Sequence, residues 1–240
     1  METGTYVFAP GVGEVLLDAY ARLQIQPTAI TQQHILHGRR EANFLQVEWA
    51  NKGPNLWTVD YQAFDMVAGT DAYTVPANTV MILDLYLSIG GGDFSSDWSP
   101  TDFNVVTSRT DRMLTPMSRS EYAALPEKAI QGPPTSFWFD RLEAPIITFY
   151  PVPDQAYRIG YYRFRQMQDA DPANGGTAEV PYLWLDALVA GMAHRLSRIY
   201  APALEALRKA DAMEAWKIAA AQNTENVSLY ISPEMSSYYR

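Results

Sequence analysis

The spacing of apolar residues predicts two helices at the start of the chain. The apolar positions of the first helix recur every three or four residues and are Val12, Val15, Leu16, Ala19 and Leu23. Gln26-Pro27 ends this run, and the second helix begins at Thr31, a favourable N-cap residue. The repeating positions of the second helix are Ile35, Gly38, Ala42, Leu45 and Trp49. It ends where Gly53 supplies a C-terminal cap and Pro54 prevents continuation.

From residue 57 to residue 168 the pattern changes to strands and turns. The first strand is predicted where apolar and mostly polar residues alternate, with Trp57, Val59, Tyr61 and Ala63 on one face. Residues 80–89 predict an apolar strand that ends at the three glycines Gly90–Gly92. Residues 137–139 and 146–150 flank a turn and predict a hairpin.

Two further elements complete this middle region. Ser118 and the residues after it predict one short helix before Pro126. Residues 157–164 alternate again, and we expect this strand to pair with a nearby one.

Helix returns after a linker at residues 169–177, which is dense in Asp, Pro and Gly. Pro181 is a favoured first-turn residue for the next helix. The apolar stripe of that helix is Leu185, Leu188, Val189, Met192, Leu196 and Ile199. Pro202 breaks or restarts the helix, which then continues to Gln222.

These elements predict an α+β fold. The helices at the two ends of the chain can pack together only if the strands between them form a separate, inserted domain. We therefore expect an α-helical bundle with an inserted antiparallel β domain and an extended C-terminal arm. The expected boundaries are 1–55 for the N-terminal helices, 56–168 for the β domain, 169–222 for the C-terminal helices and 223–240 for the arm.

Composition narrows the function classes. The formal net charge of −9 argues against a protein that holds nucleic acid, because phosphate neutralisation needs clustered Lys and Arg. The chain has no Cys, which removes disulfides and thiolate chemistry. With neither a signal-peptide pattern at the start nor an apolar run of about 18 residues, we expect no membrane span and assembly in a cytoplasm. Fifteen Tyr and six Trp are typical either of contact surfaces or of a filled core.

The residues offer little catalytic chemistry. His34, His37 and Glu41 share one predicted helix face and could in principle hold a metal, although solvated or interface side chains explain the same spacing. Neither a nucleophile elbow nor a phosphate-binding loop is present. We expect no catalytic, cofactor or metal site.

The final segment, 223–240, is more apolar than we expect of a terminal segment without a binding function. Its alternatives are a dispensable end and an arm that orders against another protein subunit. Aromatic side chains favour the arm, because they bury a large area for little loss of conformational entropy. The expected protein-binding residues are Tyr230, Ile231, Met235, Tyr238 and Tyr239.

Several landmarks occur together in one order. They are the helix at 31–52 with Trp49 near its end, Gly53–Trp57, Gly69–Pro76, Gly132–Trp138, Ile146–Pro153, and Val180–Trp184 at the start of a helix rich in small residues. In this order and spacing they resemble the head-to-tail adaptors of short-tailed bacteriophages, the tail accessory factor and tubular adaptor proteins. The resemblance covers most of residues 10–222.

The resemblance implies a structural virion protein without enzymatic activity. Such adaptors form a ring, typically of twelve copies, below the portal, and they present a surface to the tail nozzle. They attach to the portal through their helical part and C-terminal extension. DNA would pass through the channel without specific binding, since an acidic wall repels it.

Two other functions compete with this interpretation. Peptidoglycan hydrolysis is ascribed to at least one member of the resembled family, although nothing here selects a carboxylate pair. A carbohydrate-binding β module is a third possibility, but it would leave the terminal helices and the arm unexplained.

Overall fold

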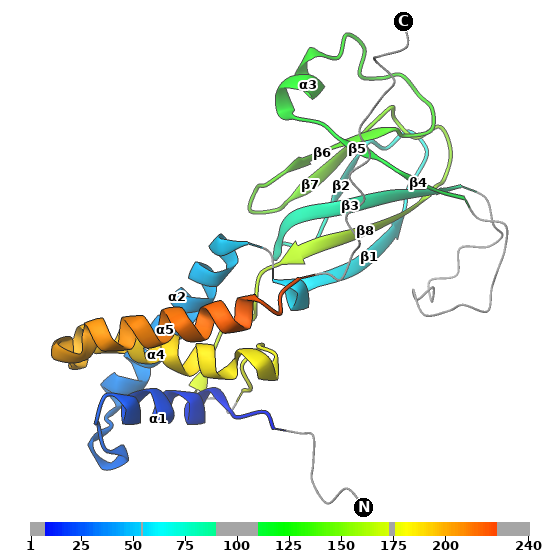
Figure 1. Ribbon diagram of the computed structural model, residues 1–240. Helices are drawn as coiled ribbons and strands as arrows, with labels where there is room; N and C mark the ends of the chain where they lie inside the picture. The colour runs from blue at the N-terminus through cyan, green and yellow to red at the C-terminus, as the bar shows by residue number, and fades with distance from the viewer. Residues whose placement is uncertain (1–7, 54, 90–109, 173–175, 225–240) are drawn as a thin grey trace, which may run out of the picture. The chain divides into compact units, whose positions relative to one another are not determined.

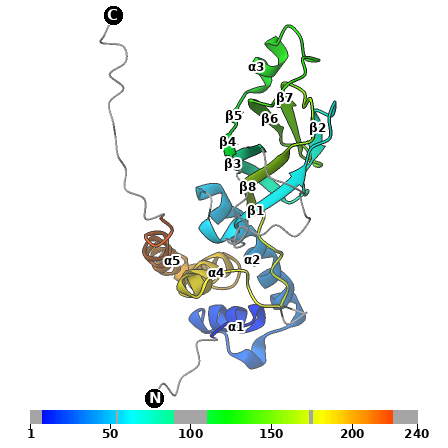
Figure 2. The same ribbon diagram turned by 90° about the vertical axis from the view of Figure 1, so that its right-hand side faces the viewer.

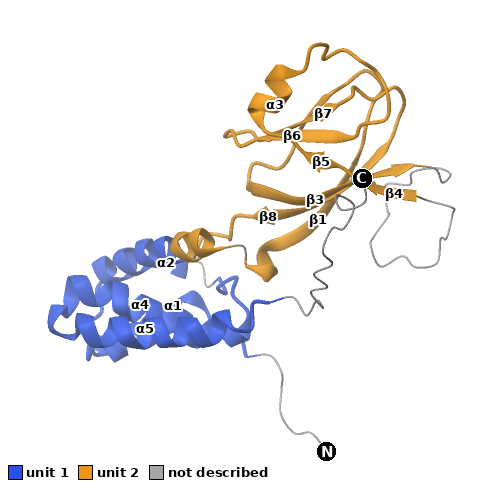
Figure 3. Ribbon diagram, turned by 45° about the horizontal axis from the view of Figure 1, so that its top comes forward, with its two compact units in different colours: residues 1–45, 170–240 blue, residues 46–169 orange. Residues whose placement is uncertain are grey.

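The computed structural model describes residues 8–53, 55–89, 110–172 and 176–224 (Figure 1). It contains both helices and sheets, which confirms the α+β class. The chain divides into two compact units (Figure 3). Residues 1–45 and 170–240 form the first, here called the helical unit, and residues 46–169 form the second, the β unit.

In the helical unit, one central helix packs against two others. Its helices are α1 (Val12–Arg22), the first part of α2 (Gln32–Lys52), α4 (Leu185–Tyr200) and α5 (Glu205–Ala220). Short 3-10 turns at Pro27–Ala29, Tyr182–Trp184 and Pro202–Leu204 precede α2, α4 and α5. α4 contacts both α1 and α5 and lies between them (Figure 2).

The predicted apolar stripes form most of the core of the helical unit. All five predicted positions of α1 are buried, as are Gly38, Ala42 and Leu45 of α2, and Leu188, Val189, Met192 and Leu196 of α4. Ile35 and Ile199 were assigned to these stripes and are instead 39% and 45% exposed, since periodicity marks an apolar position without showing whether a neighbouring helix covers it. α4 begins at Leu185, after a 3-10 turn that follows Pro181.

Glycine permits close helix packing at two places. A Cβ atom at Gly38 of α2 would collide with the side chain of Leu16 on α1. At Gly191 of α4 it would lie 2.7 Å from Cδ2 of Leu45 on α2. Both separations are shorter than real Cβ contacts, so the missing side chain sets how closely these helices approach.

The helix ends follow their predicted residues. The carbonyl of Thr31 accepts the first intrahelical hydrogen bond of α2, from the amide of Ile35 at 3.3 Å. Gly53, directly after α2, has a φ of 146°, a conformation that side chains disfavour. The short helix α3 (Arg119–Ala124) has a complete capping box between Ser118 and Glu121.

The β unit contains two four-stranded sheets among its described residues (Figure 1). The first has the order β1-β8-β3-β4, with β1 at Val59–Asp65, β8 at Arg158–Arg165, β3 at Thr79–Ile89 and β4 at Thr110–Met113. The second has the order β2-β7-β6-β5, with β2 at Ala72–Thr74, β7 at Ile146–Tyr150, β6 at Ser136–Asp140 and β5 at Thr115–Pro116.

Strand pairing confirms one prediction and corrects two. β6 and β7 form the predicted antiparallel hairpin, with Trp138 opposite Thr148. β8 pairs with β1 and β3, from much earlier in the chain, rather than with a nearby strand. β5 runs parallel to β6, so the β unit is not purely antiparallel. Alternation alone identifies a strand but carries no information about its partner.

Two features hold the β unit together. Its core comprises Met66, Val75, Ile82, Leu85, Leu87, Leu114, Phe137, Ile147, Phe149, Tyr157, Ile159 and Tyr161. Beside it the guanidinium of Arg163, a buried residue, donates two hydrogen bonds to the carboxylate of Asp60, at 2.7 and 3.0 Å. Its third nitrogen donates to Asn78 Oδ1 at 2.8 Å and to Thr79 Oγ1 at 2.7 Å. A buried cation is tolerated because its donors are satisfied.

Candidate interaction surfaces

The two histidines predicted to share one face of α2 do lie side by side, but each has a structural partner. The imidazole of His34 stacks on the ring of Tyr200 at the end of α4, with 4.4 Å between centroids. Nδ1 of His37 lies 2.7 Å from the Tyr200 hydroxyl. Tyr20 of α1 completes this cluster, since its hydroxyl donates to the His34 carbonyl at 2.7 Å. Burial raises the pKa of Tyr20 above its ordinary value.

The third member of the predicted trio is directed elsewhere. Glu41 Oε2 accepts a hydrogen bond from the guanidinium of Arg195 on α4, at 3.2 Å. No group of three His, Asp or Glu side chains within the described ranges could hold a metal ion. In this structure the trio connects α2 to α4 and acts in packing.

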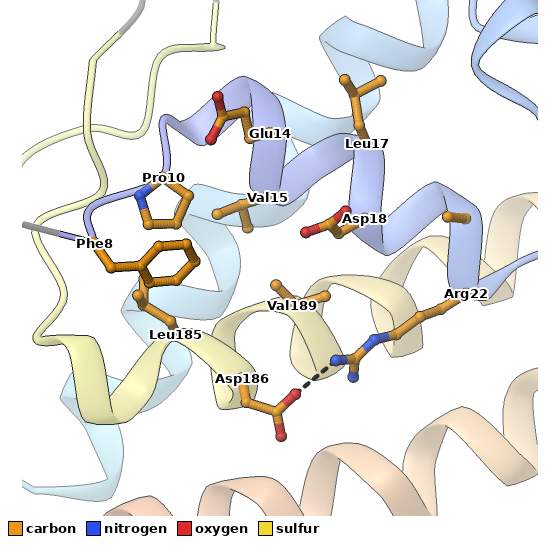
Figure 4. A pocket seen from close by; sticks show the side chains of 11 residues that line it. Phe8, Pro10, Glu14, Val15, Leu17, Asp18, Arg22, Leu185, Asp186 and Val189 are labelled. Atoms are coloured by element: carbon orange, nitrogen blue, oxygen red, sulfur yellow. Dashed lines mark hydrogen bonds and ion pairs between the residues drawn. The ribbon is translucent and has the colours of Figure 1, made fainter. Parts of the chain in front are cut away.

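An open groove lies between α1 and the start of α4, and we call it the α1 groove (Figure 4). Its volume is about 820 Å³. The apolar lining includes Phe8, Pro10, Val15, Leu17, Leu185 and Val189. The exposed carboxylates of Glu14 and Asp18 lie along its α1 side. Arg22 spans the groove to Asp186, at 2.6 Å. The α1 groove thus combines an apolar lining with an acidic rim.

A second surface runs along α5. The side chains of Leu207, Met213 and Ile218 are 52%, 64% and 67% exposed, whereas Ala219 is buried. Lys209, Glu214 and Lys217 are exposed among them. We call these six residues the α5 face. Large apolar side chains turned to solvent along one helix mark a contact surface more often than isolated exposed ones do.

The predicted portal-binding residues Tyr230, Ile231, Met235, Tyr238 and Tyr239 lie outside the described residues. Their role therefore stays a prediction. The structure adds the α1 groove and the α5 face, which sequence reasoning missed. One signal was present in the sequence: the large apolar residues Leu207, Met213 and Ile218 do not lie on one narrow stripe of the α5 helix.

Comparison with known proteins decides the family. Residues 15–229 match the family model described as SU10 adaptor protein, which covers most of the chain. The chain belongs to the SU10 adaptor protein family. This membership confirms the resemblance to phage head-to-tail adaptors. It makes this SU10 adaptor a structural component of the bacteriophage virion.

A weaker similarity connects this SU10 adaptor to a curated bacterial protein. Protein PafC of Mycobacterium tuberculosis, in strains CDC 1551 / Oshkosh and ATCC 25618 / H37Rv, is 28% identical over 164 residues. The alignment covers 66% of this chain and 48% of PafC, so the chain spans about half the length of the curated relatives it matches. In the described part of the adaptor, no helix is long and apolar enough to cross a bilayer.

Proposed function

We propose that the chain forms the head-to-tail adaptor ring that joins the portal to the tail nozzle and lines the DNA channel. The family match over residues 15–229 carries this proposal. Twelve copies is the expected number, and the ring assembles in the host cytoplasm at the packaging vertex. It stays in the path of the genome during packaging and ejection.

The C-terminal arm is the proposed portal attachment. Residues 223–240 come shortly after α5, which ends at Ala220, so the arm is joined in sequence to a helix of the helical unit. The aromatic anchors Tyr230, Tyr238 and Tyr239 supply contact area, and Ile231 and Met235 add apolar side chains. Ordering of the arm on the portal would make ring formation depend on docking.

Electrostatics supports free passage of DNA. The chain has a net charge of −9, so a channel wall that shares this sign repels the phosphate backbone. DNA would then slide without being held. A basic lumen in the assembled ring would contradict this part of the proposal.

Mixing the purified chain with the portal of its own phage, imaging the particles and counting copies tests the ring. We expect a closed ring of about twelve copies on the portal, because head-to-tail contacts between identical subunits form a ring when the rotation between neighbours closes. Portals that stay bare would overturn the proposed function.

Deletion of 223–240 tests the arm separately. The truncated chain should keep its helical content and lose portal attachment. A matched control replaces Ser236 and Ser237 with alanine, which leaves the aromatic anchors in place and should preserve attachment. Undiminished attachment of the truncated chain would rule out the arm.

A further inference from the structure

The α1 groove and the α5 face are complementary in chemistry. The groove carries three carboxylates (Glu14, Asp18 and Asp186) and one guanidinium (Arg22), a net charge of −2. The α5 face carries two lysines and one glutamate, a net charge of +1. Each surface also offers apolar side chains to solvent, so contact between them would bury apolar area and pair opposite charges.

The charged residues can also meet, although their spacing differs: Lys209 and Lys217 are eight residues apart, about 12 Å, and Glu14 and Asp18 are four apart, about 6 Å, a difference that the long lysine side chains can span. Lys209, Met213 and Lys217 are four residues apart on α5 and therefore form one row on the helix surface. Glu14 and Asp18 are likewise four residues apart on α1. A helix that placed Met213 in the groove would bring the flanking lysines to the acidic rim.

The two surfaces belong to different sides of the helical unit. α1 and α5 both pack on α4, which lies between them (Figure 2). The α5 face of one copy is thus separated from its own groove by α4. Two different but complementary surfaces on one chain are what a head-to-tail contact requires, and repetition of such a contact closes a ring.

We propose that the α5 face of each copy docks into the α1 groove of the next copy. Met213 enters the apolar part of the groove, and Lys209 and Lys217 pair with Glu14 and Asp18. This inference rests on the proposed ring, for which it names the contact between neighbouring subunits.

A crosslinking experiment tests the contact directly. Because the chain has no Cys, a pair of introduced cysteines reports on one contact only. The variant Asp18→Cys with Met213→Cys is assembled on its portal, oxidised and separated without reductant. We expect a ladder of covalent multimers, because each copy would be linked to two neighbours. The pair Asp18→Cys with Glu127→Cys, which places the second thiol on an exposed position of the β unit, is the matched control and should give no ladder.

Charge reversal tests the same contact without a crosslink. Lys209→Glu with Lys217→Glu makes the α5 face acidic, and Glu14→Lys with Asp18→Lys makes the groove rim basic. Each double variant alone should lower ring occupancy on the portal by about tenfold or more, since like charges would face each other. An equimolar mixture of the two should restore it, because every contact in an alternating ring then joins opposite charges. All four positions are exposed, and unchanged thermal melts would show that the variants fold.

The outcomes separate this inference from the proposed function. Rings of wild-type chain with no ladder from the Asp18–Met213 pair would overturn the contact and leave the ring intact. A crosslinked dimer from Met213→Cys alone would show instead that α5 packs on α5. Capture of the α5 face by the portal would appear as adaptor–portal crosslinks and would also overturn the inference. Bare portals with wild-type chain would overturn the ring and this contact together.

Discussion

The β unit and the helical unit use different residues to fill their interiors. Aromatic and branched side chains such as Phe137, Phe149 and Tyr161 dominate the core of the β unit. The helical unit combines its stripes of leucine, valine and methionine with close approach at Gly38 and Gly191 and with buried alanines: Ala19, Ala42, Ala187, Ala190, Ala193 and Ala219. On α5 the small residue faces inward and the large ones face solvent.

This difference has a physical consequence. The large side chains that fill the core of the β unit are buried within one copy, whereas α5 leaves Leu207, Met213 and Ile218 exposed for another surface. We therefore expect substitutions in the β unit to act on stability alone. Substitutions on the outer side of the helical unit should act on assembly instead.

The largest effect expected in the β unit concerns its buried arginine. Asp60→Ala removes the two hydrogen bonds to the guanidinium of Arg163 and leaves a buried cation without its counter-charge. We expect a loss of about 3 kcal/mol in the free energy of unfolding of the β unit, at the low end for such pairs because Asp60 is partly exposed. Denaturant melts followed by hydrogen exchange in β8 would measure it.

The control for this substitution is Asp65→Ala. Asp65 is half-exposed and its carboxylate lies 4.0 Å from Arg158, so a change within about 0.5 kcal/mol is expected. Equal losses for both variants would show that the Arg163 network contributes nothing specific.

Next in size is a substitution in the helical unit. Gly38→Ala places a Cβ atom against Leu16 and should cost about 1–3 kcal/mol by overpacking. In Gly13→Ala the nearest atom lies 3.9 Å away, so this helical glycine should instead gain up to about 1 kcal/mol. Thermal melts that rank the two variants in the opposite order would contradict close packing at Gly38.

Each unit contains a buried tyrosine, so the stability of each unit should depend on pH in the alkaline range. Burial raises the pKa of Tyr161 to about 12 from an ordinary value of 10.0, and burial also raises the pKa of Tyr20. Above pH 10 the unfolded chain has lost a proton that the folded chain keeps. The contribution of these tyrosines to the free energy of unfolding should therefore be constant well below pH 10 and should fall by about 1.4 kcal/mol per pH unit for each tyrosine between its unfolded and its folded pKa, which for Tyr161 is the range from pH 10 to about pH 12.

Substituting each tyrosine by phenylalanine shows which unit causes the fall in the free energy of unfolding at alkaline pH. Tyr161→Phe should flatten it for amides of the β unit, and Tyr20→Phe for amides of the helical unit, both measured by hydrogen exchange between pH 9 and 11. A slope that neither variant changes would assign the alkaline instability to other groups.

The smallest expected effect on stability is at the α5 face. Ile218→Ser removes a side chain that is two-thirds exposed and should change the free energy of unfolding by less than about 0.5 kcal/mol. Leu196→Ala on α4, which is fully buried, should cost about 2–5 kcal/mol in the same melt. A large loss for Ile218→Ser would mean that the α5 face is covered within one copy.

Sequence reasoning predicted the elements better than their partners. The periodicity of α1 and α4, the stop at Gly53 and the hairpin of β6 with β7 are local properties, and local propensity determines them. The pairing of β8 with β1 and β3 is non-local. Alternation in β8 is compatible with any strand of matching register, so the sequence could not select among them.

Of the candidate surfaces, too, the sequence predicted those that depend on local composition and missed those that depend on tertiary contacts. The aromatic arm was predicted from the sequence, because its composition is unusual for a terminal segment, and it stays a prediction. The α1 groove was not, because it needs α1 and α4 side by side, although about 170 residues separate them.

The sequence by itself determined the class of the protein: helices at both ends, strands between them, an acidic cysteine-free chain, and ordered motifs that identify an adaptor. Only the tertiary structure decided which side chains remain exposed. Helical periodicity lists the apolar positions of α5, but burial depends on which neighbour covers each face. In this protein Ala219 of α5 is buried, whereas Leu207, Met213 and Ile218 are exposed and remain available to another surface.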